Sequence, residues 1–555
     1  MVGISSARLQ HLRHTVVIVA ASLIASAGCA STRSDQAPVS TDPSATSSGK
    51  ALTPSGPKAA GALEVFESKD FIVAPARSGD TPETLAARHL GDGRKAWMIE
   101  DYTGVRTLAQ GQEVVIPKRE WNPVGVFPWG YQLVPVLVYH NMGPEDRGRL
   151  VIGVKKFEAQ MKALRAEGFQ SVSLSDYLEF TAGRKQLARK SVLITFDDGY
   201  RSFIQYARPI LKDYGFTATL FVYSDFVGGG GMSWKELSAM VAQGFDVQAH
   251  SKSHSSLRRK EGEPREAYAR RIQAELAYPA EQFRKQLGRA SDVLAYPYGD
   301  TDDELLPYVV KYGYVAAFTV RRQSNPAGPD PPKTSRSQAS PERALRDFTA
   351  NPTNFQDGEV GVARGAAGKP RGAAPAKPAA TPPAAAPAQW SRDALAAAHN
   401  NRADQLEQQG RLRQALEERL VALTINPRDR KALDAQKRLE GRITQESAAL
   451  VQEARALLGR GLVGEAQQRL LVALSLDPTN RPAFETLQND VREVMSILHT
   501  VRAGDPCPAL AELYYGDRLR CEVIAETNRL ALNVPLRPGQ KLKIPEIPGV
   551  PFQLR

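Results

Sequence analysis

Short apolar segments alternate with amphipathic segments over residues 131–340. The apolar segments are four to seven residues long and rich in Val, Leu, Ile and Phe, which is typical of buried parallel strands. They occupy 133–139, 192–196, 217–222, 245–249, 293–296 and 316–320, and helices are predicted over 155–167, 203–214, 234–243 and 302–312. Repeated strand–helix units predict an α/β sheet or barrel, whose functional side chains gather at the carboxyl ends of the strands.

Polar residues directly follow two of these predicted strands. Asp197 and Asp198 follow the second, and His250 and His254 follow the fourth. Histidines four positions apart on a helical turn point the same way, so both can bind one metal ion. With one aspartate they leave a coordination position open, as a catalytic metal site requires. Each motif alone is more often a turn or a core residue, and only their combination at successive strand ends indicates a metal site.

The two ends of the chain share a repeated pattern. Gly79-Asp80, Gly91-Asp92 and Gly111-Gln112 recur as Gly504-Asp505, Gly516-Asp517 and Gly539-Gln540. The offset is 425 residues for the first two pairs and 428 for the third. Each copy predicts a strand, two helices and a second strand, over 66–120 and 497–548.

A second repeat, with a period of 51 residues, lies within 391–495. Small residues recur at predicted helix crossings, and an Asx-Pro pair ends one helix of each unit. The pattern predicts all-α helical repeats, each with more than two helices. Residues 341–390 are rich in Pro and Ala and are predicted to be an extended linker.

The first 29 residues have a basic start, a short apolar stretch and small residues before Cys29. This arrangement resembles a bacterial lipoprotein signal, which implies acylation of Cys29, and an ordinary signal peptide is the alternative. The resemblance implies an exported protein anchored in the cell envelope, at the outer membrane facing the periplasm. Residues 30–65 are predicted to be a flexible tether.

Composition adds two expectations. The net charge of +12 favours contact with an acidic surface such as an anionic lipid or glycan, although a solvated basic surface has the same composition. The three cysteines are too few for a disulfide framework. Besides Cys29 they leave Cys507 and Cys521, which could either form a disulfide or remain thiols.

The central region resembles the polysaccharide deacetylase family (NodB-like, carbohydrate esterase family four). The motifs that carry the resemblance are Thr195-Phe196-Asp197-Asp198-Gly199, His250-Ser251-x-x-His254 and Tyr296-Pro297-Tyr298-Gly299. The resemblance implies a distorted (β/α) barrel, with Asp197 as general base. It implies that Asp198, His250 and His254 hold a divalent ion, with zinc the expected one. Tyr296, Pro297 and Tyr298 would line the groove for substrate, and the Tyr298 backbone N–H could stabilise the oxyanion.

The flanking repeats also resemble known modules. The repeat at the chain ends is similar to the LysM module, which binds chains containing N-acetylglucosamine, and the C-terminal copy matches better. The helical repeats resemble tetratricopeptide pairs, which implies either a protein partner or a spacer. We expect no nucleic-acid partner.

Two departures from the family's pattern affect the predicted site. Ala295 stands where many relatives have an arginine beside the catalytic aspartate, and the late Leu-x-His motif for a general acid is absent. His140 is the candidate replacement for the acid, with a structural hydrogen-bonding role as its alternative, and Arg336 is the candidate replacement for the arginine. Trp234 is a candidate sugar platform, with core packing as the alternative.

Three hypotheses follow. The first is a metal-dependent deacetylase that removes N-acetyl groups from N-acetylglucosamine units of peptidoglycan or an exopolysaccharide. The second is a non-catalytic glycan-binding scaffold lipoprotein, motivated by the missing arginine and histidine. The third keeps the metal but changes the bond cleaved to another amide or an O-acetyl ester.

Overall fold

The computed structural model describes residues 64–302, 304–320, 337–338, 355–357, 391–491, 496–502, 505–528, 530 and 535–545. The predicted signal segment, Cys29 and Arg336 lie outside these residues. Among the described helices, none combines the length and the apolar character needed to cross a bilayer.

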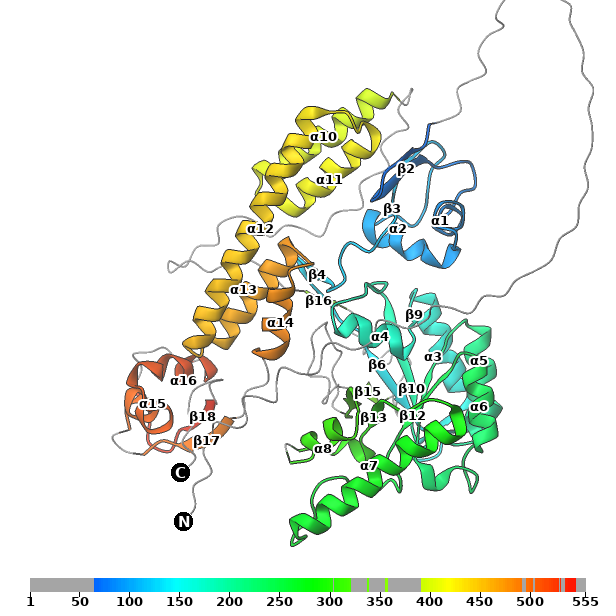
Figure 1. Ribbon diagram of the computed structural model, residues 1–555, viewed down its shortest axis with the longest axis vertical. Helices are drawn as coiled ribbons and strands as arrows, with labels where there is room; N and C mark the ends of the chain where they lie inside the picture. Colours follow the sequence, from blue (N-terminus) through cyan, green and yellow to red (C-terminus); the bar gives the residue numbers. More distant parts are fainter. Residues whose placement is uncertain are drawn as a thin grey trace, which may run out of the picture. The chain divides into compact units, whose positions relative to one another are not determined.

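The central feature is a parallel sheet of eight strands in the order β14-β13-β12-β11-β10-β6-β15, with β9 paired to β10 (Figure 1). The strands are β6 (Val136–Tyr139), β9 (Gln170–Ser171), β10 (Ser191–Phe196), β11 (Thr219–Val222), β12 (Asp246–Ala249), β13 (Val293–Ala295), β14 (Ala316–Phe318) and β15 (Ser337–Gln338). From β10 to β14 each strand pairs with the next in the chain, which is the progression of a barrel. β14 and β15 do not pair within the described residues, so this part forms a curled, open barrel-type sheet. The predicted α/β fold class is confirmed.

Helices flank this sheet. They are α3 (Val154–Ala166), α4 (Leu174–Thr181), α5 (Arg208–Asp213), α6 (Trp234–Ala242), α7 (Arg265–Leu287) and α8 (Leu306–Lys311). Side-chain caps fix two of the starts, because Ser173 begins α4 and Ser233 forms a capping box with Glu236 at α6. The 23-residue α7 was not predicted, although its buried Tyr268, Ile272 and Leu276 have helical spacing.

An aromatic cluster packs beneath the carboxyl ends of β6 and β10. The ring of Tyr139 contacts Phe157 and Phe196 with centroids 5.0 and 5.2 Å apart, and Phe196 contacts Phe203 at 4.9 Å. All four rings are almost completely buried. Because Tyr139 and Phe196 are also partners in the strand register, this packing fixes where the two following loops begin.

Short strands complete the central region. β7 (Asn141–Gly143) pairs with β8 (Val151–Gly153), and β5 (Gly130–Gln132) pairs with both β4 (Val126–Phe127) and β16 (Phe355–Asp357).

Both end modules have the predicted strand–helix–helix–strand order. The first comprises β1 (Phe66–Glu67), β2 (Phe71–Pro75), α1 (Pro82–Leu90), α2 (Ala96–Thr103) and β3 (Glu113–Pro117), and the second β17 (Ser496–Thr500), α15 (Cys507–Tyr515), α16 (Cys521–Thr527) and β18 (Lys541–Pro545). Asp80 and Asp505 each accept a hydrogen bond from the backbone N–H three residues earlier, both at 2.8 Å. Gln112 and Gln540 do the same at 3.0 and 3.1 Å. The repeated residues therefore close the same turns in both copies.

The helical segment consists of α10 (Arg392–Gln408), α11 (Leu412–Ile425), α12 (Arg430–Gly459), α13 (Val463–Leu476) and α14 (Arg481–Asn489). α12 is one continuous helix of 30 residues. Its first half is the predicted extra helix of the first unit, and its second half opens the next unit. Asn426 and Asp477, the Asx residues of the repeat, cap the ends of α11 and α13.

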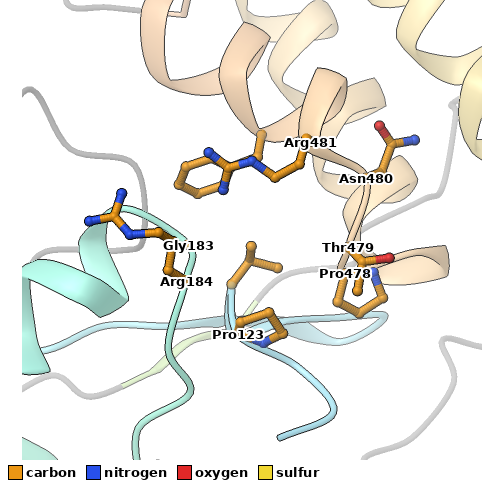
Figure 2. A pocket seen from close by; sticks show the side chains of 9 residues that line it. Pro123, Gly183, Arg184, Pro478, Thr479, Asn480 and Arg481 are labelled. Carbon is orange, nitrogen blue, oxygen red and sulfur yellow. The ribbon is translucent and has the colours of Figure 1, made fainter. Parts of the chain in front are cut away.

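One pocket lies away from the strand ends that carry the aspartates and histidines. It has a volume of about 460 Å³, and Pro123, Gly183 and Arg184 line it together with Pro478, Arg481 and Phe484 (Figure 2). The Arg184 guanidinium is bonded to Glu179, and Arg481 donates to the Ala182 carbonyl. The described chain places no metal-ligating cluster there.

Candidate metal centre at the sheet edge

The predicted metal ligands converge at the carboxyl edge of the parallel sheet. Asp198 follows β10, while His250 and His254 follow β12, two strands away in the sheet. One ligand atom from each of the three residues lies within 4.8 Å of the others. The His254 Nε2 atom is 3.2 Å from Asp198 Oδ1, and the His250 Nε2 atom is 3.6 Å from the same oxygen. These distances place all three groups where they can share one ion.

The orientation of His250 suits a metal ligand. Its Nδ1 atom lies 2.7 Å from the Ala295 carbonyl oxygen, so the Nδ1–H donates there and Nε2 carries the lone pair toward Asp198. A hydrogen bond of this kind fixes the tautomer and the ring direction of metal-ligating histidines. Ala295 thus contributes a backbone carbonyl to the candidate metal site.

Burial also keeps the second histidine in its ligand form. Desolvation by burial lowers the pKa of His254 below its ordinary value, and the negative charges of Asp197 and Glu275 oppose this shift. A lowered pKa favours the neutral imidazole near pH 7. Neutral imidazole is the form that binds metal ions.

Backbone strain concentrates in the loops around this cluster. Among the described residues, the non-glycine positions with positive φ are Asp198, Ser251, His254 and Tyr298. Each costs on the order of 1–3 kcal/mol and persists only where the surroundings hold it. Since all four lie in loops that follow β10, β12 or β13, the strain belongs to the candidate site.

Glycines permit the close packing of two of these loops. Gly199 has φ of +86°, and a Cβ atom there would lie 2.8 Å from Val222 Cγ1. Gly299 has φ of +72°, and its Cβ would lie 2.6 Å from the Val320 backbone nitrogen. The glycines of the Asp-Asp-Gly and Tyr-Pro-Tyr-Gly motifs are therefore required by φ and by space.

Asp197 and His140, the two residues predicted to transfer protons, lie next to each other at the ends of two neighbouring strands. Tyr139 and Phe196 are register partners and end their strands, so His140 and Asp197 are the first residues after β6 and β10. The Asp197 backbone N–H donates to the Tyr139 carbonyl at 2.9 Å. Asp197 Oδ2 is 3.9 Å from His250 Nε2, and the Asp197 side chain is 2% exposed. Asp197 thus lies beside the predicted metal ligands, and His140 is half-buried at the adjacent strand end.

The predicted groove residues differ in exposure. Tyr296 and Pro297 are buried, whereas Tyr298 is 63% exposed. The Tyr298 ring lies edge-on to His254, with centroids 4.8 Å apart. Of these three side chains, Tyr298 is the one that is exposed beside the candidate metal ligands.

Trp234 is partly buried and packs against the core. It begins α6 and lies edge-on to the buried Phe283 of α7, with ring centroids 5.6 Å apart. Its other neighbours belong to the hydrophobic core of the sheet. Arg336, the candidate replacement for the missing arginine, lies outside the described residues.

Sequence reasoning missed two residues near the histidines. Tyr223 directly follows β11, and its ring centroid lies 5.2 Å from that of His254, which Tyr298 also contacts. Because functional side chains gather at the carboxyl ends of strands, the position of Tyr223 directly after a predicted strand could have marked it. Glu275 lies on α7 and bonds the loop that carries His254. No sequence motif marks Glu275, since its role depends on how α7 packs.

Comparison with known proteins identifies two domains. Residues 184–317 match the family model described as polysaccharide deacetylase, and residues 499–545 match the LysM domain. The Bacillus subtilis protein YxkH is 29% identical over 187 residues, which is 34% of this chain and 64% of that protein. A poly-β-1,6-N-acetyl-D-glucosamine N-deacetylase of Staphylococcus aureus is 27% identical over 196 residues, 34% of this chain and 67% of that one.

Two solved structures resemble part of the chain. IcaB from Ammonifex degensii is 28% identical and covers 40% of this chain and 97% of its own, with a TM-score of 0.36. The deacetylase PplD of Streptococcus pyogenes is 22% identical and covers 40% and 98%, with a TM-score of 0.37. The family matches and the convergence of the predicted ligands together identify residues 184–317 as a polysaccharide deacetylase domain and residues 499–545 as a LysM domain.

Proposed function

We propose that this protein is a metal-dependent N-deacetylase that removes acetyl groups from N-acetylglucosamine units of a cell-envelope polysaccharide. The observation that carries the proposal is the convergence of Asp197, Asp198, His250 and His254 at one sheet edge. This set combines two imidazole ligands, one carboxylate ligand and a second carboxylate that remains available for proton transfer.

The residues divide the chemistry between them. A divalent cation held by Asp198, His250 and His254 would act as a Lewis acid toward the acetamide carbonyl. Asp197 takes a proton from the attacking water, and His140 returns one to the leaving amine. The buried position of Asp197 excludes bulk water and strengthens its interaction with nearby charge. Tyr298 contacts the sugar ring beside the acetamide group.

The substrate class is inferred from the two identified domains. The Staphylococcus aureus relatives are described as acting on poly-β-1,6-N-acetyl-D-glucosamine, and we infer that the LysM domain binds glycan that contains N-acetylglucosamine. An exported poly-N-acetylglucosamine and peptidoglycan both present this sugar. We place the helical repeats as a spacer or a protein-binding segment between the two domains.

The proposed location is the cell envelope, through export and acylation of Cys29. Cys507 and Cys521 form a disulfide that links α15 to α16, with Cα atoms 5.4 Å apart. Structural disulfides persist in oxidising compartments such as the periplasm, which supports export.

Acetate release from purified peptidoglycan and from poly-β-1,6-N-acetylglucosamine, measured side by side with and without a chelator, tests the function. We expect release from at least one polymer, loss with chelator and recovery on adding Zn²⁺. Absence of acetate from both polymers, with zinc bound, would support the glycan-binding scaffold instead. Acetate from O-acetylated but not N-acetylated glycan would assign a different bond.

The Asp197→Asn variant tests the assignment of the base. Positioned proton transfer contributes about 10²–10⁴-fold to rate, so we expect a loss of that size in kcat. The metal content should stay near that of the wild type, because Asp198 and the histidines are unchanged. A fully active variant would overturn the role of Asp197.

A further inference from the structure

The loop that carries both metal-binding histidines has an unfavourable backbone. It leaves β12 at Ala249, and Ser251 and His254 have φ of +69° and +61°. Within the loop, the His254 N–H donates to Ser251 Oγ at 3.1 Å. One local hydrogen bond contributes about 1 kcal/mol, which is less than the cost of two left-handed residues. The conformation therefore needs support from outside the loop.

Glu275, on the neighbouring helix α7, supplies that support. Its Oε2 atom accepts hydrogen bonds from the backbone N–H groups of Lys252 and Ser253, at 3.0 and 2.9 Å. Its Oε1 atom accepts from the hydroxyls of Ser253 and Ser255, at 2.6 and 3.3 Å. The carboxylate thus bonds Lys252, Ser253 and Ser255, which lie on both sides of His254 in the chain.

The bonds between Glu275 and residues 252–255, which we call the clamp, join neutral donors to a buried carboxylate. Glu275 is 6% exposed. The ammonium group of Lys252 bonds Asp225, with both oxygens at 2.8 Å, while its backbone N–H bonds Glu275. Hydrogen bonds to a charged acceptor are roughly twice as strong as neutral ones, and a buried carboxylate requires them. Loss of the carboxylate would leave the loop's donors without their acceptor.

The helix that carries Glu275 is a rigid support. Its Tyr268, Ile272 and Leu276 side chains are fully buried against the sheet, and the Tyr314 hydroxyl donates to the Leu276 carbonyl at 3.0 Å. The loop after β11 is bonded to the same segment, because the Asp225 N–H donates to the Lys252 carbonyl at 2.9 Å. Because α7 is packed in the core and its Glu275 bonds the histidine loop, the position of α7 restricts the conformation of that loop.

We propose that Glu275 is a positioning residue that sets the affinity of the site for its divalent cation by holding the 251–255 loop in the geometry that brings His254 to Asp198. This inference rests on the proposed metal-dependent function. Glu275 touches neither the ligand atoms nor the substrate, and it acts through the backbone of the loop. Outer groups that orient ligands typically contribute about 10–100-fold to metal affinity.

The test measures Zn²⁺ affinity of the full chain by competition with a chromophoric chelator. We expect Glu275→Ala to weaken binding by about 10–100-fold. Glu275→Gln should retain most of the affinity, because its amide oxygen can accept from the two N–H groups and its NH₂ can donate to the two serine hydroxyls. The matched control is Glu281→Ala, an exposed glutamate of the same helix, which should bind like the wild type.

Outcomes separate this inference from the proposed function. A wild type that binds no zinc would remove the proposed function, whereas wild-type affinity in Glu275→Ala would overturn the clamp alone. A Gln variant as weak as the Ala variant would also overturn it, since the hydrogen-bond geometry would then not be what matters. Should Glu275→Ala fail to fold, Ser253→Ala removes one clamp contact, and unchanged zinc affinity there would count against the proposal.

Discussion

At the scale of single residues, Tyr298 combines a strained backbone with an exposed ring beside a metal ligand. It has φ of +60° and is 63% exposed, and its ring contacts His254. An exposed aromatic ring held at this cost contributes little to the core. Its position instead suits contact with a sugar face.

For Tyr298→Ala we predict a higher KM with little change in Tm. Aromatic contacts contribute about 0.5–1.5 kcal/mol, which corresponds to a rise in KM of roughly 2- to 10-fold. Steady-state kinetics on N-acetylglucosamine oligomers and a thermal melt provide the two readouts. A large drop in Tm with unchanged KM would assign the ring to stability.

Gly199 is the residue on which the Asp-Asp-Gly turn depends. For Gly199→Ala we predict a loss of about 1–3 kcal/mol of stability together with reduced activity, because the new Cβ meets Val222 at a left-handed position. Gly244→Ala is the matched control, since Gly244 has φ of +90° and open space around its Cβ position. Chemical denaturation should show the smaller loss in the control, and equal losses would exclude the steric contribution.

At the scale of elements, the disulfide joins the two helices of the LysM domain. Cys507 begins α15 and Cys521 begins α16, 14 residues later. Closing a loop of this size stabilises a small domain by about 3 kcal/mol through the unfolded state. Such a small core gains a large part of its stability from one cross-link.

We therefore predict that Cys507→Ser with Cys521→Ser lowers the stability of the LysM domain while acetate release from short oligomers is retained. Limited proteolysis followed by mass spectrometry should locate new cleavage within 496–545. Protection equal to that of the wild type would show that the disulfide is dispensable. Acetate release measures the deacetylase domain independently.

At the scale of the whole molecule, a buried histidine joins the first module to the helical repeats. His399 of α10 is 3% exposed and lies 2.5 Å from Glu113 of β3 and 2.6 Å from Glu418 of α11. Arg402 also bonds Glu418 and approaches the ring. Burial lowers the pKa of His399, but its hydrogen bonds to the two glutamates outweigh burial and raise the pKa above the ordinary 6.5.

A raised folded-state pKa gives a defined direction of pH dependence. The stability from His399 is fully present below its unfolded pKa near 6.5 and is lost as pH rises through the higher folded value. We predict that unfolding becomes easier between neutral and alkaline pH, measured by denaturant titration at several pH values. His399→Gln should flatten this dependence, and an unchanged profile would contradict the role of the imidazolium.

Much of the fold and site follows from local sequence. Continuous apolar runs predicted β10, β11 and β12 within about two residues, since a parallel strand is buried on both faces. The ligand set was predictable because strand ends meet at one sheet edge. α7 was missed, and with it Glu275, because its long polar face and Pro279 obscure the helical pattern.

The sequence by itself determined the alternation of strands and helices and the paired repeats, because these depend on periodicity and spacing, and its family resemblance singled out Asp198, His250 and His254 as candidate ligands. Only the tertiary structure decided that Ala295 orients His250 through its carbonyl, that Glu275 holds the histidine loop and that Tyr296 is buried while Tyr298 is exposed. These depend on contacts between segments distant in the chain, and local sequence carries no record of which segments pack together.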